Sequence, residues 1–247
     1  MDRASGPAPH PYLDWPGPIA FAHRGGAIDA PENTMRAFEQ AVGLGYRYLE
    51  TDVHVTADGV VVAFHDDDLA RTCGRPGRIS DLPFADVEAA RVDGTETIPT
   101  LRDLLDAFSE IRLNIDCKSD AAVGPLADEI AKHGALDRVC LASFSDARIR
   151  SLRRRLGADL CSAAATRELA VLWATGRNLG DASAAQVPVR QRGMTVVTER
   201  FIRRAHNAHV AVHVWTIDDP AEMHRLLDLG VDGIMTDRPV ALRDVFV

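Results

Sequence analysis

The sequence has few lysines, few cysteines and no long apolar run. Of its 28 basic side chains only Lys118 and Lys132 are lysines, and 36 acidic residues give a formal net charge of -8. An acidic chain is poorly suited to nucleic acid or to an anionic membrane surface, so we expect neither as a partner. An anionic ligand would need positive charge supplied locally, by a few arginines, a lysine or a metal ion.

The cysteines and the apolar runs bear on the compartment. The four cysteines lie far apart and form no Cys-x-x-Cys pair, and three of them sit in apolar runs, where a small buried thiol is the usual interpretation. The start of the chain lacks a basic segment followed by an apolar one, and no later run is long enough to span a bilayer. We therefore expect reduced cysteines, a cytoplasmic location and no stable insertion in a membrane.

The sequence does contain a repeated alternation of β-rich runs and helical patterns. This alternation favours a parallel sheet, and the length of 247 residues suits an α/β fold of the (β/α)8 TIM barrel type. Strands are predicted at 19–23, 48–55, 60–65, 113–118, 138–143, 159–163, 195–198, 210–217 and 233–236. Helices are predicted at 33–44, 101–108, 123–133, 146–156, 167–176, 200–208 and 221–229.

The domain organisation follows from composition. Residues 1–18 are rich in proline and glycine and are predicted to be a flexible arm. Residues 19–247 are predicted to form a single barrel domain, in which the weakly periodic stretch 67–98 is a small insertion. Nine strand candidates compete for eight places, and Thr-Ala-Asp-Gly at 56–59 predicts a hairpin that removes one of them. The sequence does not indicate an oligomeric state.

A histidine and an arginine, His23 and Arg24, follow the first predicted strand and precede two glycines. In a parallel barrel, reactive residues gather at the carboxyl ends of the strands. Gly25 and Gly26 would let the backbone and a ligand approach each other closely, and the following Pro-Glu-Asn-Thr supplies turn and helix-capping residues. The alternative is a polar loop that contains a histidine by chance.

The second predicted strand reads YLETDVHV and carries two acids, Glu50 and Asp52, on one face, because alternate residues of a strand point the same way. Two carboxylates on one inward face repel each other and lose hydration unless a cation lies between them. Ligation by oxygen alone suits Mg²⁺ or Ca²⁺ better than zinc. The alternative is an exposed edge strand whose acids are solvated.

Two further strands end in residues of the same kind. His65 ends an apolar run and would form an acid–base pair with His23, each member contributing about 10²–10⁴ in rate; a purely structural histidine is the alternative. On the run LNIDCK, Asn114, Asp116 and Lys118 share one face. Lys118 would offer a point charge to a phosphate oxygen, or it only extends from the strand end to solvent.

Taken in order, these motifs resemble the glycerophosphodiester phosphodiesterase family. The succession is HRGG, PENT, ETD, FHD and the acid-x-Lys strand, followed by Ser143-Phe144, VWTID at 214–218 and GVDGIMTDRP at 230–239. The match runs from about Phe21 to Pro239, nearly the whole chain. Single motifs such as Glu-x-Asp are weak, but the ordered set is specific.

The resemblance implies a role for each residue of the set. These are the general acid–base pair His23 and His65; the ligands Glu50, Asp52 and Asp116 of a divalent metal, Mg²⁺ or Ca²⁺; the phosphate contacts Arg24 and Lys118; and Trp215 near the glycerol or alcohol group. Asp116 stands where the family usually has glutamate. Its side chain is one methylene shorter, so a bridging water or a shifted ion would have to make up the reach.

The implied activity is metal-dependent hydrolysis of a small-molecule glycerophosphodiester to sn-glycerol 3-phosphate and an alcohol. The attacking oxygen is that of water or of the glycerol 2-hydroxyl, the latter through a cyclic phosphate. The sequence does not decide which of these oxygens attacks, and it does not decide which histidine acts first as the base. Two alternatives remain: a phosphodiesterase like lysophospholipase D or sphingomyelinase D, which would need an apolar entrance, and a non-catalytic barrel that binds a phosphate ligand.

Overall fold

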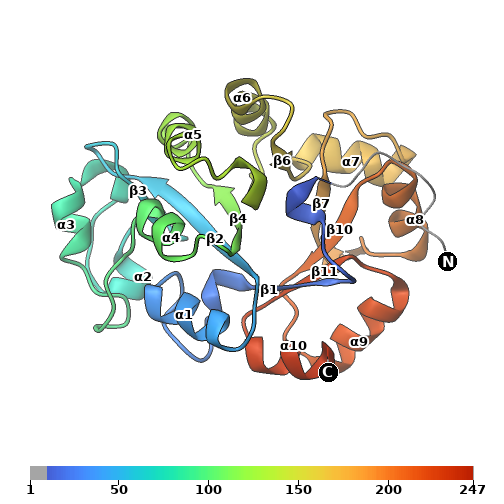
Figure 1. Ribbon diagram of the computed structural model, residues 1–247, viewed down its shortest axis with the longest axis horizontal. Helices are drawn as coiled ribbons and strands as arrows, with labels where there is room; N and C mark the ends of the chain where they lie inside the picture. Colours follow the sequence, from blue (N-terminus) through green and yellow to red (C-terminus); the bar gives the residue numbers. More distant parts are fainter. Residues whose placement is uncertain (1–9, 247) are drawn as a thin grey trace.

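The strands form a ring that closes between β6 and β7. The computed structural model describes residues 10–246, and there eight parallel strands follow the order β6-β5-β4-β2-β1-β11-β10-β7. The ends of this series meet where Ala163 bridges Ala184, and the amide of Ala164 donates to the Ala184 carbonyl at 2.7 Å. Figure 1 shows the helices arranged around the outside of the strands. The predicted TIM-type (β/α)8 barrel is confirmed.

Most element bounds lie within a few residues of those predicted. The barrel strands are β1 (Ile19–Ala22), β2 (Tyr48–Val55), β4 (Arg112–Cys117), β5 (Val139–Ala142), β6 (Cys161–Ser162), β7 (Ala184–Pro188), β10 (Ala211–Trp215) and β11 (Gly233–Thr236). The helices around them are α1 (Met35–Gly43), α4 (Leu101–Ala107), α5 (Val123–Lys132), α6 (Asp146–Leu156), α7 (Thr166–Thr175), α8 (Glu199–Asn207), α9 (Pro220–Leu229) and α10 (Pro239–Phe246). Within residues 10–246 no helix combines the length and the apolar character that crossing a membrane requires.

The sixth barrel strand in chain order, β7, is not the predicted one. The β-branched run at 195–198 suggested a strand, but the barrel uses β7, and the segment after it forms a short hairpin of β8 (Arg190–Gln191) and β9 (Met194–Thr195). The β7 sequence Ala-Ala-Gln-Val-Pro has weak β propensity. It is extended because it pairs along its length with β10, so tertiary pairing overrides local preference.

Part of the predicted flexible arm fills the amino end of the barrel. The short turn η1 (Pro11–Leu13) places Tyr12 in full burial, and the Tyr48 hydroxyl donates to its carbonyl oxygen at 2.6 Å. The two rings meet edge to face, with centroids 5.3 Å apart. Tyr12 and Trp15 of the predicted arm thus contact the barrel through aromatic surface. The flexibility of the arm stays a prediction, and residues 1–9 lie outside the described part of the chain.

The stretch 67–98 lies between the antiparallel strand β3 (Val61–Ala63), which pairs with β2, and helix α4. It contains the short helices α2 (Ala70–Cys73), η3 (Ile79–Asp81) and α3 (Phe84–Glu88). Its buried apolar side chains form a cluster with β3 that is separate from the main core. Figure 1 shows α2 and α3 beside β3, outside the ring of barrel helices.

An imidazole without a polar partner is buried inside the barrel. His213 on β10 is fully buried, and its ring packs against Phe21 with centroids 4.8 Å apart. Within residues 10–246 neither ring nitrogen has a hydrogen-bond partner. Burial lowers the pKa of His213 from 6.5 to about 4, because the apolar interior disfavours the charged ring.

This imidazole should make the fold sensitive to mild acid. Between pH 6.5 and about 4 the unfolded chain binds a proton at His213 that the folded chain refuses, so stability falls as pH falls, by up to about 3 kcal/mol. Urea unfolding across this window should show that loss in the wild type relative to His213→Leu. A constant difference between the two proteins across the window would contradict the buried neutral imidazole.

Candidate active site

A cavity of about 240 Å³ opens at the carboxyl ends of the strands. Its wall brings together side chains from the strands β2, β4, β5, β7, β10 and β11 and from the segments that follow β1, β3, β4 and β5. All eight residues predicted for the site line it: His23, Arg24, Glu50, Asp52, His65, Asp116, Lys118 and Trp215. Segments almost 200 residues apart in sequence therefore converge on one cavity, as the predicted site requires.

The three acids are placed by the register of two neighbouring strands. Asp52 of β2 is paired with Asp116 of β4, and two residues earlier Glu50 is paired with Asn114. Side chains at this spacing point into the barrel, and the exposed fractions of Glu50, Asp52 and Asp116 are 5%, 2% and 9%. Such close packing of buried carboxylates requires positive charge nearby.

Lys118 supplies part of that charge. Its Nζ lies 2.7 Å from Asp52 Oδ1 and 2.7 Å from Asp116 Oδ2, so one ammonium links the two strands. Burial alone would raise the pKa of Asp52, but Lys118 and Arg24 outweigh it and hold that pKa below its ordinary value. For the same reason the pKa of Lys118 is raised in spite of its burial. Both groups are therefore charged at neutral pH.

Arg24 holds the other side of the acid pair. Its Nε lies 3.1 Å from Asp52 Oδ2, and its backbone amide donates to Glu50 Oε2 at 3.0 Å. Its Nη1 also donates to Glu32 at 3.0 Å. The residue adopts φ 53° and ψ 28°, a left-handed conformation that is unfavourable for an L-residue and here turns both the amide and the side chain toward the acids.

The two glycines after Arg24 are required by close packing. A Cβ at Gly25 would lie 2.7 Å from the Cβ of Ala37 on α1, and one at Gly26 would lie 2.4 Å from Pro239 at the start of α10. Both residues also have positive φ. Packing therefore gives a structural reason for both glycines: they let the chain turn sharply after β1 between two helices. The expected close approach of a ligand stays a prediction.

Glu50 and His23 form a second pair at the floor of the cavity. The pKa of Glu50 is raised to about 7, first by burial and then by the neighbouring charge of Asp52. His23 Nε2 lies 3.8 Å from Glu50 Oε2, and its Nδ1 lies 2.6 Å from Asp237 Oδ1. Burial lowers the pKa of His23, but the two carboxylates raise it more, so that it lies above 6.5.

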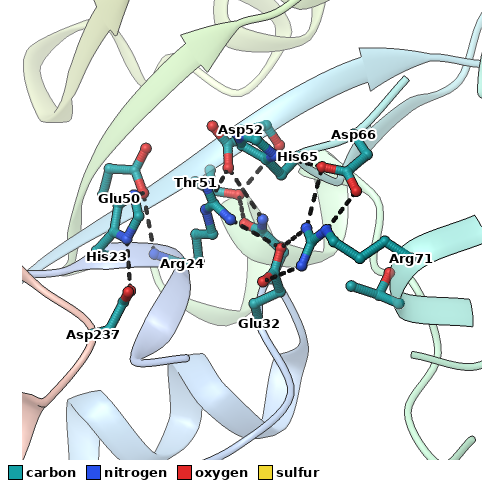
Figure 2. Close-up of polar contacts among 12 residues, drawn as sticks. His23, Arg24, Glu32, Glu50, Thr51, Asp52, His65, Asp66, Arg71 and Asp237 are labelled. Atoms are coloured by element: carbon teal, nitrogen blue, oxygen red, sulfur yellow. Dashed lines mark hydrogen bonds and ion pairs between the residues drawn. The ribbon is translucent and has the colours of Figure 1, made fainter. Parts of the chain in front are cut away.

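His65 is oriented in the same manner from the opposite side. Its Nδ1 lies 2.6 Å from Asp66 Oδ1. The pKa of Asp66 is lowered to about 2, chiefly by hydrogen bonds from Arg71. The carboxylate is therefore ionised and accepts, the Nδ1–H of His65 donates, and Nε2 is left for the cavity. Figure 2 shows His23 and His65 on the two sides of the acid pair.

Several polar residues of this region were not predicted. Asp66 and Asp237, which contact the two histidines, were quoted only as parts of motifs, although acids next to a histidine or in a conspicuous loop are a usable signal. Gln186 exchanges hydrogen bonds with Asn114 across the barrel at 2.6 and 3.3 Å. It lies on β7, the strand that the sequence did not reveal, and for that reason it was missed.

One wall of the cavity is apolar. Phe144, at the end of β5, and Trp215, at the end of β10, meet edge to face with ring centroids 6.0 Å apart. Leu169 of α7 lines the same wall. Phe144 is 62% exposed, so the apolar surface continues outward from the acidic floor. Phe144 therefore adds exposed apolar surface to this wall.

The donors present suit a hard divalent cation, although they are not arranged as a closed cage. Glu50, Asp52 and Asp116 offer oxygen alone, and Asp116 Oδ1 is buried with no hydrogen-bond partner in the described part of the chain. Within residues 10–246 no three His, Cys, Asp or Glu side chains are grouped closely enough to hold an ion. The Lys118 ammonium lies between two of the acids instead.

Comparison with known sequences gives a consistent result over the whole barrel. Residues 23–241 match the glycerophosphoryl diester phosphodiesterase family. The chain is 42% identical to a probable glycerophosphodiester phosphodiesterase 2 of Mycobacterium tuberculosis, over 96% of this chain and 93% of the relative. It is also 26% identical to the human lysophospholipase D GDPD1, over 91% of this chain and 84% of that protein.

A solved structure has the same fold. A phosphodiesterase of Oleispira antarctica, in complex with the product sn-glycerol 3-phosphate, superposes with a TM-score of 0.80 at 23% identity. The superposition covers 93% of this chain and 97% of the other. At that level of identity the likeness concerns the fold.

Removing Lys118 should destabilise the fold, because the buried acids then lack a cation. In Lys118→Met we expect the free energy of unfolding to fall by about 3 kcal/mol at pH 7 with chelator present, because Asp52 and Asp116 lose their shared cation. The deficit should shrink as the pH falls, because the lysine holds the pKa of Asp52 below its ordinary value, so that Asp52 takes up a proton at a higher pH in the variant than in the wild type. Denaturant titrations at pH 7 and at lower pH check this, and the exposed Lys132→Met is the control. Equal stability of Lys118→Met and wild type would contradict the ionic link.

Proposed function

The chain belongs to the glycerophosphoryl diester phosphodiesterase family, and on that basis we propose that it hydrolyses glycerophosphodiesters to sn-glycerol 3-phosphate and an alcohol. The observation that carries the proposal is the convergence on one cavity of His23 and His65 with Arg24, Lys118 and the three acids. Each histidine has Nδ1 held by a carboxylate. This is an arrangement suited to proton transfer at a cationic phosphate site.

We infer that the two imidazoles move the protons of the reaction. One accepts the proton of the attacking oxygen as that oxygen bonds to phosphorus, and the other donates a proton to the alkoxide as its bond to phosphorus breaks. Asp237 and Asp66 contact Nδ1 of His23 and His65, so that the Nε2 atoms, that of His23 beside Glu50, would make these transfers. Arg24 and Lys118 would bind the non-bridging oxygens, on which negative charge grows.

The charge balance of the cavity favours a metal ion as part of the proposal. Three carboxylates line it and three more contact residues of its wall, and three side chains with permanent positive charge oppose these six acids. The acids are Glu32, Glu50, Asp52, Asp66, Asp116 and Asp237; the cations are Arg24, Arg71 and Lys118. An anionic diester would enter against this excess of negative charge. We propose that Glu50, Asp52 and Asp116 hold Mg²⁺ or Ca²⁺, which supplies electrostatic stabilisation of the charge on the phosphate.

The apolar wall bears on the alcohol group. We propose that Trp215 and Phe144 contact the glycerol or alcohol part of the diester, because apolar and ionic surfaces lie on different sides of the cavity. A lysophospholipid is a second candidate substrate, favoured by the exposed Phe144 and by the lysophospholipase D relative. All four cysteines are free thiols, which supports a reducing compartment, and we propose a cytoplasmic location.

Chelation tests the metal and the substrate together. Hydrolysis should be measured after exhaustive chelation and after adding back Mg²⁺ or Ca²⁺. For glycerophosphocholine, glycerophosphoethanolamine and glycerophosphoinositol the product measured is sn-glycerol 3-phosphate, and for a lysophosphatidylcholine, which keeps its acyl chain, it is choline. We expect activity on the glycerophosphodiesters to vanish and return, and the melting temperature to rise with the ion in the wild type but not in Asp52→Asn. Full activity in the chelated enzyme would sink the metal assignment, and no release from any diester would sink the activity.

The histidines should each be needed for turnover. We expect His23→Ala and His65→Ala to lower kcat by about 10²–10⁴ while they remain folded, because each loses one proton transfer. The control is His224→Gln, an exposed position on α9 away from the cavity, which should keep wild-type kinetics. Circular dichroism checks the fold. Near wild-type turnover in either alanine variant would falsify the acid–base pair.

A further inference from the structure

One side chain of the insertion bridges two carboxylates, each of which contacts a residue that lines the cavity. Arg71 lies in α2, within the stretch 67–98. Its guanidinium is located between the carboxylates of Glu32 and Asp66, as Figure 2 shows. Glu32 belongs to the loop between β1 and α1, whereas Asp66 follows β3, so Arg71 links two segments that do not pair with each other.

The contacts of Arg71 are bidentate on both sides. Its Nε donates to Asp66 Oδ2 at 2.5 Å and its Nη2 to Asp66 Oδ1 at 3.2 Å. Toward Glu32, Nη2 donates to Oε1 at 2.6 Å and Nη1 to Oε2 at 3.0 Å. Only a planar guanidinium can make two such forked pairs at once, since an ammonium presents a single centre of charge.

Each of the two carboxylates in turn contacts a residue of the site. Asp66 Oδ1 accepts from His65 Nδ1 at 2.6 Å, so the orientation of that imidazole depends on where the carboxylate is held. Glu32 Oε1 accepts from Arg24 Nη1 at 3.0 Å, and this bond restrains the guanidinium that pairs with Asp52. Arg71 therefore acts on the acid–base side through Asp66 and on the phosphate side through Glu32.

The exposure of Arg71 argues against a role in stability alone. Its side chain is 49% exposed, against 15% for Glu32 and 24% for Asp66. Ion pairs with such solvent access contribute little to folding. They still fix geometry when several hydrogen bonds share one rigid group, and reaction rates are sensitive to misplacement of about 1 Å.

We infer that Arg71 is a positioning residue for the phosphodiester reaction: it sets His65 through Asp66 and Arg24 through Glu32. The inference rests on the proposed function, and it assigns the insertion a role in positioning the residues of the site. Loss of Arg71 should therefore affect both turnover and substrate affinity, whereas loss of either carboxylate should affect mainly one of them.

The first experiment separates these two effects. In Arg71→Met we expect kcat to fall by about 10- to 100-fold and KM to rise several-fold. Asp66→Asn should lower kcat with little change in KM, and Glu32→Gln should raise KM with little change in kcat. In the Asp66→Asn background, Arg71→Met should lower kcat little further, because the path to His65 is already broken. The matched control is Arg78→Met, which removes an exposed arginine of the same insertion that pairs with Asp67 at 3.4 Å.

The second experiment asks whether the missing group can be replaced. The position is half exposed, so free guanidinium at tens of millimolar should restore part of the kcat of Arg71→Ala, while sodium chloride of equal ionic strength should not. A readout without turnover is the imidazole proton of His65: by NMR its Nδ1–H should exchange slowly in the wild type and fast in Arg71→Met. Melting temperatures identify any variant that fails to fold.

The outcomes distinguish the role of Arg71 from the proposed function. Wild-type kcat and KM in a folded Arg71→Met, or a slowly exchanging His65 proton in that variant, would overturn the role of Arg71 while the wild-type activity in the same assay upholds the proposed function. A wild type that releases no sn-glycerol 3-phosphate would overturn the proposed function. The exchange of the His65 proton would then still decide whether Arg71 positions the imidazole.

Discussion

The burial of three carboxylates at the open end of a parallel barrel is the constraint on which the rest of the site depends. Glu50, Asp52 and Asp116 are fixed there by strand register, and their mutual repulsion has to be opposed by cations that come from other segments. Lys118 comes from the strand that carries Asp116, and Arg24 comes from the turn after β1. The distorted backbone of Arg24 is intelligible in this light, because the left-handed turn brings its amide to Glu50 and its side chain to Asp52.

The part of the site that lies on strands was predictable, because alternation along a strand fixes which side chains share a face. Glu50, Asp52, Asp116 and Lys118 follow from that rule and from the spacing of their strands. The ordered motifs then placed His23 and His65 at neighbouring strand ends. Contacts made by loops across the mouth follow no such rule. Arg71 gives no periodic or motif signal, and its partner Glu32 read only as part of a helix-capping sequence.

The fold was predictable for the same reason. The prediction failed at β7, a segment whose conformation depends on contacts with distant residues. Apolar runs and helix caps gave most of the barrel, but β7 is extended only because its neighbours pair with it. Its sequence of alanines, a glutamine and a proline has no strand preference to detect. The consequence reached the site, since Gln186 and its bond to Asn114 were lost with the strand. The glycines after Arg24 illustrate a different limit. A side chain is excluded at these two positions by Ala37 and Pro239, and Pro239 lies more than 200 residues further along the sequence.

The inside of the barrel changes character along its axis, and this gradient explains why the ionic cluster forms at one end only. At the amino end Tyr12 and Tyr48 close the interior with aromatic surface. In the middle the imidazole of His213 stays neutral, because burial lowers its pKa more than the charge of Asp232 raises it. At the carboxyl end the strands stop, and the loops supply counter-charges to the buried acids. An ionic site of this kind can therefore be assembled only where several loops meet, which is why a residue of the insertion can act on it without belonging to the barrel.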